Sequence, residues 1–411
     1  KDFLVAIREF LALVASHERF IPETARRLGD PTFTKDLYLA NHTITKFVSE
    51  QRQFLKDVLL SLDKHSKAAL ALIYMRNDSL ESPIELLPEE EGALARLGSD
   101  VGGSLLALQA MNGSLVNYIS GDSEANWRYK HPTIGDAYAE ILASTPELLS
   151  IYITGTEPEK LVGQITCGNV GLEKATVVPA KLFDEIIDKL DNFKRSGVYK
   201  TDYLSDWSVK RQLLSFLTRR SSKTFVKRFL DRKPDFLDKV IPLSGYLRWS
   251  EELELILKLH EYDLLDDADR NKVIDSLFKF AQEGDLYALE DEDVQKLFKG
   301  DEFSNFRDKV RAEIVPKLSD IRYNFESNYD RGGINEADEH MEHYLDALKT
   351  IKKTFEDSSI HNIIDQEESR AQDWISENKE TRYEKPSRKL DLAKSEKSFI
   401  TSRNIFDDIA D

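Results

Sequence analysis

The sequence has few of the features that mark secreted or membrane-spanning proteins. It contains one cysteine, Cys167, so no intramolecular disulfide can form, and such usage favours a reducing compartment such as the cytoplasm. No run of about 18 apolar residues occurs, which argues against a transmembrane helix. The chain begins without methionine, inside an apparent helix that does not resemble a signal peptide, so we expect it to be the C-terminal part of a longer protein.

The sequence also lacks catalytic motifs. It has no glycine-rich loop of the form Gly-x-x-x-x-Gly-Lys-Ser/Thr and no apolar strand that ends in paired acids, so it offers neither a cradle for a triphosphate nor a Mg²⁺ site. Cys167 has no histidine close in sequence, and Ser114 and Ser120 lack the glycine elbow of a hydrolase. We therefore expect this part of the protein not to be an enzyme by itself.

The overall charge disfavours polyanionic partners. The 411 residues include 74 acidic and 57 basic side chains, for a net charge of −17. Nucleic acids and anionic membranes attract basic proteins, so the chain as a whole is a poor match for either. Its length allows two or three domains and a large core.

Helical periodicity dominates what is present. Residues 1–50 read as a helical domain, with one amphipathic segment over residues 3–17 and a second helix from Pro22 to Leu28. Gly29, Asp30 and Pro31 follow as a helix stop signal, because glycine caps a helix end and proline cannot continue it. The pattern Gly-x-Pro by itself is a common helix boundary and carries no functional information.

Residues 51–150 are predicted to form a winged helix. Helical patterns cover residues 43–62 and 64–76, and two further helices are expected from Pro88 and from residue 101 to residue 111, the last capped by Ser99 or Asp100. Asn112-Gly113 signals a turn, after which residues 115–119 and 126–130 read as the two strands of a hairpin.

His131 stands where this hairpin meets a closing helix. Pro132 suits the first helical position, so His131 lies at or next to a helix N-terminus. Free backbone N–H groups and the helix dipole favour an anion such as phosphate there. A histidine before a helix is more often a cap or a packed side chain. The alternative, that His131 contacts the phosphate of a nucleotide, is supported only by its combination with the Gly-x-Pro turn.

The predicted winged helix is poorly suited to DNA. The helix over residues 101–111 contains no lysine or arginine, and the loop between the strands carries Asp122 and Glu124. Base recognition and phosphate neutralisation both require basic or amide side chains, and Gln109 is the single residue on this helix that could recognise a base. We expect no sequence-specific binding of duplex DNA.

Three segments resemble a known family. They are Arg19–Thr34 (RFIPETARRLGDPTFT), Ala68–Arg76 (AALALIYMR) and Tyr129–Ala137 (YKHPTIGDA). Together with a winged helix that ends in strand, histidine and helix, they make residues 1–190 resemble the regulatory half of STAND NTPases, in particular the bacterial group called novel STAND NTPase 3.

The resemblance implies roles for three residues. In such proteins the proline of Gly-x-Pro packs against adenine and the winged-helix histidine contacts the β-phosphate of ADP. These roles fall on Pro31, with Gly29 shaping the turn, and on His131. The common form of the motif is Met-His-Asp, whereas Lys130 and Pro132 flank the histidine here, so the resemblance does not assign the roles of its neighbours.

The C-terminal half is also predicted to be helical. Residues 151–285 form a sensor or repeat-like region, either an α-solenoid or an irregular bundle, and residues 286–411 form an acidic helical region with a polar, flexible tail over 380–403. The expected helices span 180–193, 205–217, 222–230, 250–261, 266–283 and 290–298. His340 and His343 lie one turn apart beside acids, which we interpret as a solvated helix face rather than a metal site.

One basic segment stands out in this acidic chain. Residues 194–233 contain twelve lysines and arginines against three acids. One interpretation is a helix face that pairs with acidic helices elsewhere in the chain, and the other is a docking surface for an acidic partner or a nucleic-acid backbone, carried by Arg219, Arg220 and Arg228.

The sequence as a whole predicts a mainly α, regulatory chain: a helical domain, a winged helix and a helical sensor region. The resemblance implies that it is the nucleotide-sensing and trigger-sensing half of a STAND-type ATPase that acts in bacterial anti-phage defence. ATP or ADP, with Mg²⁺, would be held together with an upstream nucleotide-binding domain, the trigger would be a protein or nucleic acid, and activation would produce a homo-oligomer. The alternative is a helical scaffold or adaptor whose winged helix binds protein.

Overall fold

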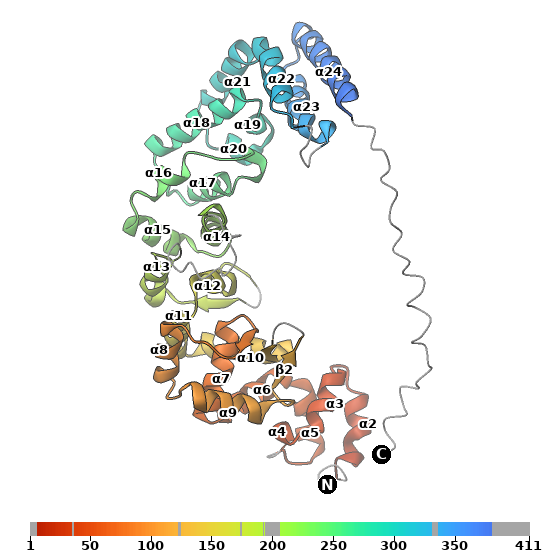
Figure 1. Ribbon diagram of the computed structural model, residues 1–411, viewed down its shortest axis with the longest axis vertical. Helices are drawn as coiled ribbons and strands as arrows, with labels where there is room; N and C mark the ends of the chain where they lie inside the picture. Colours follow the sequence, from red (N-terminus) through yellow and green to blue (C-terminus); the bar gives the residue numbers. More distant parts are fainter. Residues whose placement is uncertain are drawn as a thin grey trace. The chain divides into compact units, whose positions relative to one another are not determined.

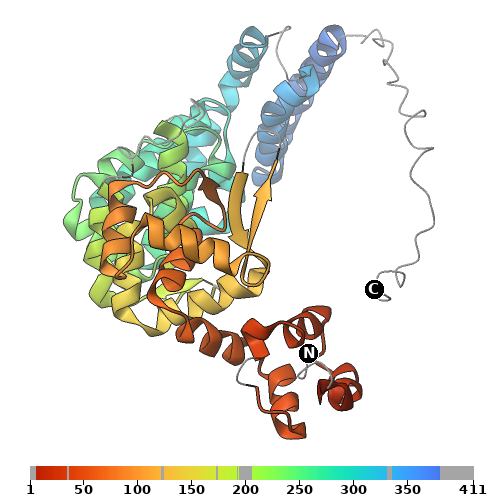
Figure 2. The ribbon, with the colours of Figure 1, turned by 60° about the horizontal axis from the view of Figure 1, so that its bottom comes forward.

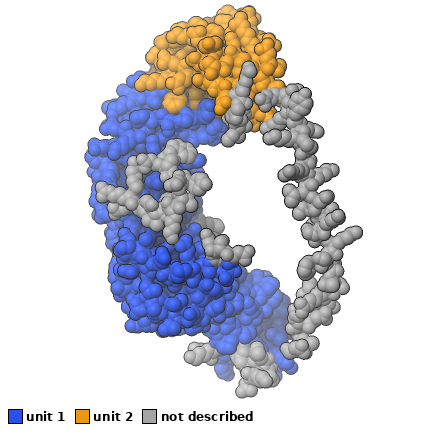
Figure 3. All heavy atoms as spheres, in the orientation of Figure 1, with its two compact units in different colours: residues 1–276 blue, residues 277–411 orange. Residues whose placement is uncertain are grey.

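The computed structural model describes residues 6–34, 37–121, 125–172, 175–191, 193, 206–330 and 336–379. These residues are mainly helical, with two small sheets, so the mainly α class predicted from the sequence is confirmed (Figure 1). The chain divides into two compact units, residues 1–276 and 277–411, and helix α18 (Asp267–Gln282) contains the division (Figure 3). The predicted boundaries at residues 50 and 150 both lie within the first unit.

The first unit begins with a small helical cluster. Its buried side chains, among them Leu28, Ile44 and Phe47, form a core of their own. Residues 3–17, expected as one helix, contain a 3₁₀ turn followed by a short helix where the structure describes them, and the helix expected over 43–62 is interrupted at Glu50. The elements are η1 (Ile7–Phe10), α2 (Leu11–Ala15), α3 (Pro22–Leu28), α4 (Pro31–Thr34), α5 (Asn41–Ser49) and α6 (Gln51–Ser61).

A mixed module of helices and a three-stranded sheet follows. Its elements are α7 (Lys64–Met75), β1 (Leu80–Ser82), α8 (Pro88–Arg96), α9 (Val101–Met111), β2 (Val116–Ser120), β3 (Ala125–Tyr129) and α10 (Pro132–Ser144). The strands are antiparallel in the order β1-β3-β2, with Val116 opposite Tyr129 (Figure 2). The predicted hairpin is confirmed, and β1 is a third strand that the sequence pattern did not indicate. The Asn112-Gly113 turn joins α9 to β2 rather than two strands.

Helix α7 is the centre of this module. Asp63 caps it by accepting hydrogen bonds from the backbone N–H groups of His65 and Ser66 at 2.8 and 3.1 Å. Residues 68–73 are all buried, as the nearly all-apolar pattern predicted. The Tyr129 hydroxyl donates to the Leu70 carbonyl at 2.7 Å, which ties the sheet to this helix.

The rest of the first unit is a succession of helices and one small parallel sheet. Strands β4 and β5 pair in parallel, and Cys167 lies opposite Val178. The sequence did not predict this pair, because residues 151–285 were assigned to a helical region. The elements are α11 (Pro146–Gly155), α12 (Pro158–Gln164), β4 (Ile165–Cys167), β5 (Thr176–Val178), η2 (Ala180–Leu182), α13 (Phe183–Asp191), α14 (Asp206–Arg219), α15 (Lys223–Arg232), α16 (Phe236–Val240), η3 (Leu247–Trp249), α17 (Glu251–Glu261) and α18.

The second unit is helical throughout its described part. A buried hydrogen bond from the Tyr344 hydroxyl to the Leu318 carbonyl, at 3.1 Å, joins α23 to α22, and Arg322 pairs with Glu367 of α24 at 2.9 Å. The elements are α19 (Tyr287–Glu290), α20 (Glu292–Gln295), α21 (Glu302–Glu313), η4 (Val315–Lys317), α22 (Leu318–Ser327), α23 (Ala337–Thr354) and α24 (Ser358–Asn378). The helix expected over 290–298 is reduced to α20, and the predicted tail lies outside the described residues.

Candidate functional site

His131 is the N-cap of α10, as its position before Pro132 predicted. Its Nδ1 accepts from the backbone N–H of Thr133 at 3.3 Å and lies 3.0 Å from the Thr133 hydroxyl. A ring nitrogen that accepts carries no proton, so the neutral imidazole holds its proton on Nε2. Among the described residues, no hydrogen-bond partner contacts Nε2. The half-buried side chain is thus oriented by the cap and keeps one donor for another molecule.

A buried arginine joins this cap to the helix before the Gly-x-Pro turn. Arg27, 3% exposed, donates from Nη2 to the Thr133 hydroxyl oxygen at 2.5 Å. Its Nε donates to Glu23 on the same helix at 3.0 Å. Because the Thr133 oxygen accepts from Arg27, its own proton is free to point at His131, and a chain of polar contacts runs from Glu23 to the imidazole. The sequence did not single out Arg27, since nothing local shows that it points into a tertiary contact.

The structure therefore joins α3, the helix that Gly29 caps, to α10, the helix that His131 caps. Gly29 is the C-cap of α3, and Pro31 is the first residue of α4; both are exposed. The predicted helix stop is confirmed, and Pro31 also begins a new turn. Phe33, in the same short helix, is buried, and the guanidinium groups of Arg26 and Arg27 lie 5.8 and 5.7 Å from the centre of its ring.

Helix α9 presents an apolar outer face. Val101 and Leu105 are each 37% exposed and Leu106 is 68% exposed, and none of its residues is basic. Gln109 is also exposed. Such a face can contact another apolar surface, whereas it offers no cation to a phosphate backbone. The expectation that this module does not read duplex DNA stays a prediction.

All but one of the described cations in the basic segment form ion pairs within the chain, and Arg220 is the exception. Residues 194–205 lie outside the described residues. In the remainder the paired cations of α14 meet acids of α17, and Arg228 and Arg232 of α15 meet acids of α13. The ion pairs are Lys210–Glu252, Arg211–Glu251, Arg219–Glu254, Lys223–Asp263, Lys227–Asp231, Arg228–Asp184, Arg232–Asp184, Arg232–Asp188 and Lys233–Asp191. The interpretation as a helix face that pairs with acidic helices is confirmed for these residues, and partner docking stays a prediction.

The three arginines chosen for docking do not share one environment. Arg219 donates to both carboxylate oxygens of Glu254 at 2.8 and 3.1 Å, and Arg228 pairs with Asp184. The Arg220 side chain donates to the Ile165 carbonyl at 3.3 Å and forms no ion pair with a carboxylate in the described chain. Of the three, Arg220 alone keeps a charge that no acid neutralises.

The remaining candidates have structural roles. Cys167 is fully buried in β4, and burial raises the pKa of its thiol well above the ordinary value, which disfavours a thiolate nucleophile. The His340 Nε2 lies 2.6 Å from the Phe325 carbonyl, and its ring packs against Tyr329 and Trp374. No cluster of three or more potential metal ligands occurs within the described ranges.

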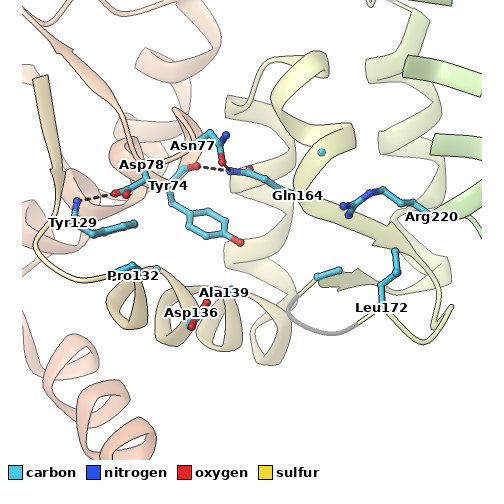
Figure 4. Close-up of a pocket in the computed structure, with 13 residues that line it drawn as sticks. Tyr74, Asn77, Asp78, Tyr129, Pro132, Asp136, Ala139, Gln164, Leu172 and Arg220 are labelled. Carbon is cyan, nitrogen blue, oxygen red and sulfur yellow. Dashed lines mark hydrogen bonds between the residues drawn. The ribbon is translucent and has the colours of Figure 1, made fainter. Parts of the chain in front are cut away.

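Sequence reasoning missed a cavity beside α10. It is lined by Tyr74, Asp78, Asp136, Gln164 and Arg220, among others, and has a volume of about 400 Å³ (Figure 4). These residues come from segments up to 146 positions apart, between Tyr74 and Arg220. The one local signal was Asn77-Asp78 at the end of α7, since these residue types tolerate the left-handed backbone that both adopt here.

No helix in the described segments combines the length and the apolar character needed to cross a membrane. Comparison with known proteins found no matching family model, no similar curated protein and no similar solved structure.

Proposed function

We propose that this chain is the regulatory and trigger-sensing half of a STAND-type ATPase switch. In this proposal residues 51–150 contain a winged helix, because their order of helices and strands and their closing helix after His131 suit that module. An upstream nucleotide-binding domain holds ADP, and this chain closes over it with Pro31 against the adenine and the His131 Nε2–H directed to the β-phosphate.

The observation that carries the proposal is the contact from Arg27 through Thr133 to His131. A nucleotide has its base and its phosphates at opposite ends, so a clamp needs the two recognition elements to be held at a fixed spacing. The buried Arg27 supplies that coupling, since α3 cannot move away from α10 without leaving its guanidinium and the Thr133 hydroxyl without this partner. In this proposal the chain reports the nucleotide state and the trigger, hydrolysis belongs to the nucleotide-binding domain, and the protein is a cytoplasmic defence protein that oligomerises on activation.

The first test is ADP release from the complete protein with His131→Ala. Loss of one hydrogen bond to the phosphate weakens ADP binding by about 1–3 kcal/mol, or roughly 5- to 150-fold. The matched control is His131→Asn, which retains a side chain able to cap α10 but places no donor at the Nε2 position. Fast ADP release in both variants supports the sensor role, whereas release at the wild-type rate in both refutes it.

A second candidate function rests on the exposed face of α9. Leu106, 68% exposed, and its neighbours Val101 and Leu105 suit a protein partner, as in a helical scaffold or adaptor. Scattering measurements on the complete protein with ADP and with ATP separate the two candidates. A switch changes its assembly state with nucleotide, and an adaptor does not.

A further inference from the structure

The cavity beside α10 has two poles of opposite charge. Arg220 lies at one end, and Asp78 and Asp136 lie at the other, with the Tyr74 ring between them (Figure 4). Its volume of about 400 Å³ falls within the range of small-molecule sites. All of its lining residues belong to the first compact unit.

Arg220 supplies the positive pole. The side chain is half-buried, and the guanidinium is anchored through Nη1 to the Ile165 carbonyl at 3.3 Å. That contact uses one donor of five, and in the described part of the chain no acid occupies the others. Its neighbour Arg219 is held by Glu254, so the difference between the two is one of position and not of residue type. Figure 4 shows the guanidinium directed into the cavity.

Asp78 and Asp136 supply the negative pole. Asp78 adopts a left-handed backbone with φ of 63°, and its Oδ1 accepts from the Tyr129 backbone N–H at 2.7 Å. Neither carboxylate forms an ion pair with any cation that the structure describes. Burial raises the pKa of Asp78. Arg128 attracts the Asp78 carboxylate without an ion-pair contact, and a half-buried carboxylate is stabilised further when a ligand cation approaches it.

The wall between the poles is fixed by its own hydrogen bonds. Gln164 donates to the Tyr74 carbonyl at 3.1 Å and to the Asn77 side-chain oxygen at 3.2 Å. The Tyr74 hydroxyl lies 3.0 Å from the Thr176 hydroxyl. Because these groups are already oriented, a ligand loses little free energy in ordering them.

We propose that this cavity binds a basic amino acid, whose α-carboxylate pairs with Arg220 and whose cationic side chain lies over Tyr74 between Asp78 and Asp136. A pair of separated charges in the ligand matches the pair of separated charges in the wall, and an aromatic face favours a cation. A simple anion would meet the two acids, and a simple cation would leave Arg220 without a partner.

This site is distinct from the one proposed for nucleotide. The cavity includes Pro132 and Gly135, so a ligand there would contact α10, the helix that His131 caps. Binding is measurable on the chain without any nucleotide. The result of a binding test at this cavity is therefore independent of whether the proposed nucleotide switch is correct.

The first arm of the test uses ligands that differ in one group. L-arginine is titrated into the wild-type chain by calorimetry at neutral pH and low salt, and we expect a dissociation constant below about 1 mM. Agmatine lacks the carboxylate and L-citrulline lacks the cationic charge, and each should bind about tenfold more weakly or worse. The proposal is overturned if L-arginine shows no saturable binding, or if either analogue binds as well as L-arginine.

The second arm uses matched variants. Arg220→Gln and Asp136→Asn should each weaken L-arginine binding about tenfold or more. Arg219→Gln and Glu140→Gln are the controls, because Arg219 pairs with Glu254 and Glu140 pairs with Lys56 outside this cavity, and both should bind like wild type. Equal binding by Arg220→Gln and Arg219→Gln refutes the site. Arg220→Lys keeps the charge and should bind between wild type and Arg220→Gln, which separates loss of the pole from loss of folding.

Discussion

Two regions of the first unit use arginine in opposite ways. Between α3 and α10, Arg27 is 3% exposed and makes one directed contact across the interface, to Thr133. Between α15 and α13, Arg228 and Arg232 are partly exposed; both pair with Asp184, and Arg232 also pairs with Asp188, in a network of surface ion pairs. The sequence shows the second region plainly as a basic segment and gives no sign of the first.

The difference shows that the local density of charged residues in the sequence is a poor guide to how much each residue contributes to the free energy of unfolding. Exposed ion pairs are screened by water and contribute little, whereas a buried guanidinium is costly to leave without its partners. We therefore expect one substitution at Arg27 to lower the free energy of unfolding more than any single substitution among the ion pairs between α13 and α15.

The largest effect is expected from Arg27→Met. This change removes the bond to Thr133 and one of the contacts to Glu23, and we expect the free energy of unfolding to fall by about 2–4 kcal/mol in urea titration. Arg26→Met is the control, because the Arg26 side chain is 29% exposed and lacks the contact to Thr133. If Arg26→Met lowered the free energy of unfolding as much as Arg27→Met, the contact to Thr133 would not explain the effect.

An intermediate, pH-dependent effect is expected from Glu252→Gln. Burial raises the pKa of Glu252, but hydrogen bonds from Lys210, its own backbone and Ser244 outweigh it, so the pKa lies below the ordinary value of 4.5. A lowered carboxyl pKa stabilises the fold above pH 4.5, and this contribution is lost as pH falls through the folded-state pKa.

We therefore expect Glu252→Gln to cost about 1 kcal/mol at neutral pH and to differ less from wild type as the pH approaches about 3. Denaturant unfolding across this range measures it. The control is Glu254→Gln, whose side chain is 41% exposed and pairs with Arg219. A difference between Glu252→Gln and wild type that stayed constant with pH would show that lost packing, and not charge, is responsible.

The smallest effect is expected from Arg228→Glu. The new carboxylate faces Asp184, and because both positions are 40–50% exposed the loss should be about 0.5–1 kcal/mol at low salt and less at high salt. Adding Asp184→Arg should restore most of it. Failure of the swap to recover stability, together with loss of triggering in the complete protein, would instead favour partner docking by this surface.

Prediction from sequence succeeded where the determinants are local. The helices beginning at Pro22, Lys64, Val101 and Pro132 were expected from their caps, prolines and apolar periodicity, and the structure has them. It failed for β1, β4 and β5, because strands of three residues are stabilised by their partners and carry little pattern of their own.

The candidate site divides in the same way. The capping position of His131 follows from the adjacent Pro132, and the end of α3 follows from Gly29 and Pro31. The contact between them depends on Arg27 reaching a residue 106 positions away, which no spacing in the sequence reveals. The cavity at Arg220 was hidden for the same reason, and its arginine was grouped with neighbours whose charges are paired.

The sequence by itself determined the helical class, the helix ends and the excess of positive charge in residues 194–233, because caps, periodicity and charge act over a few residues. Only the tertiary structure decided which cations meet acids, that Arg220 lies beside a cavity without an acidic partner, and how α3 is joined to α10, the helix that His131 caps. These outcomes depend on burial and on distances between segments far apart in the chain, and the same residue type takes opposite roles according to what folds against it.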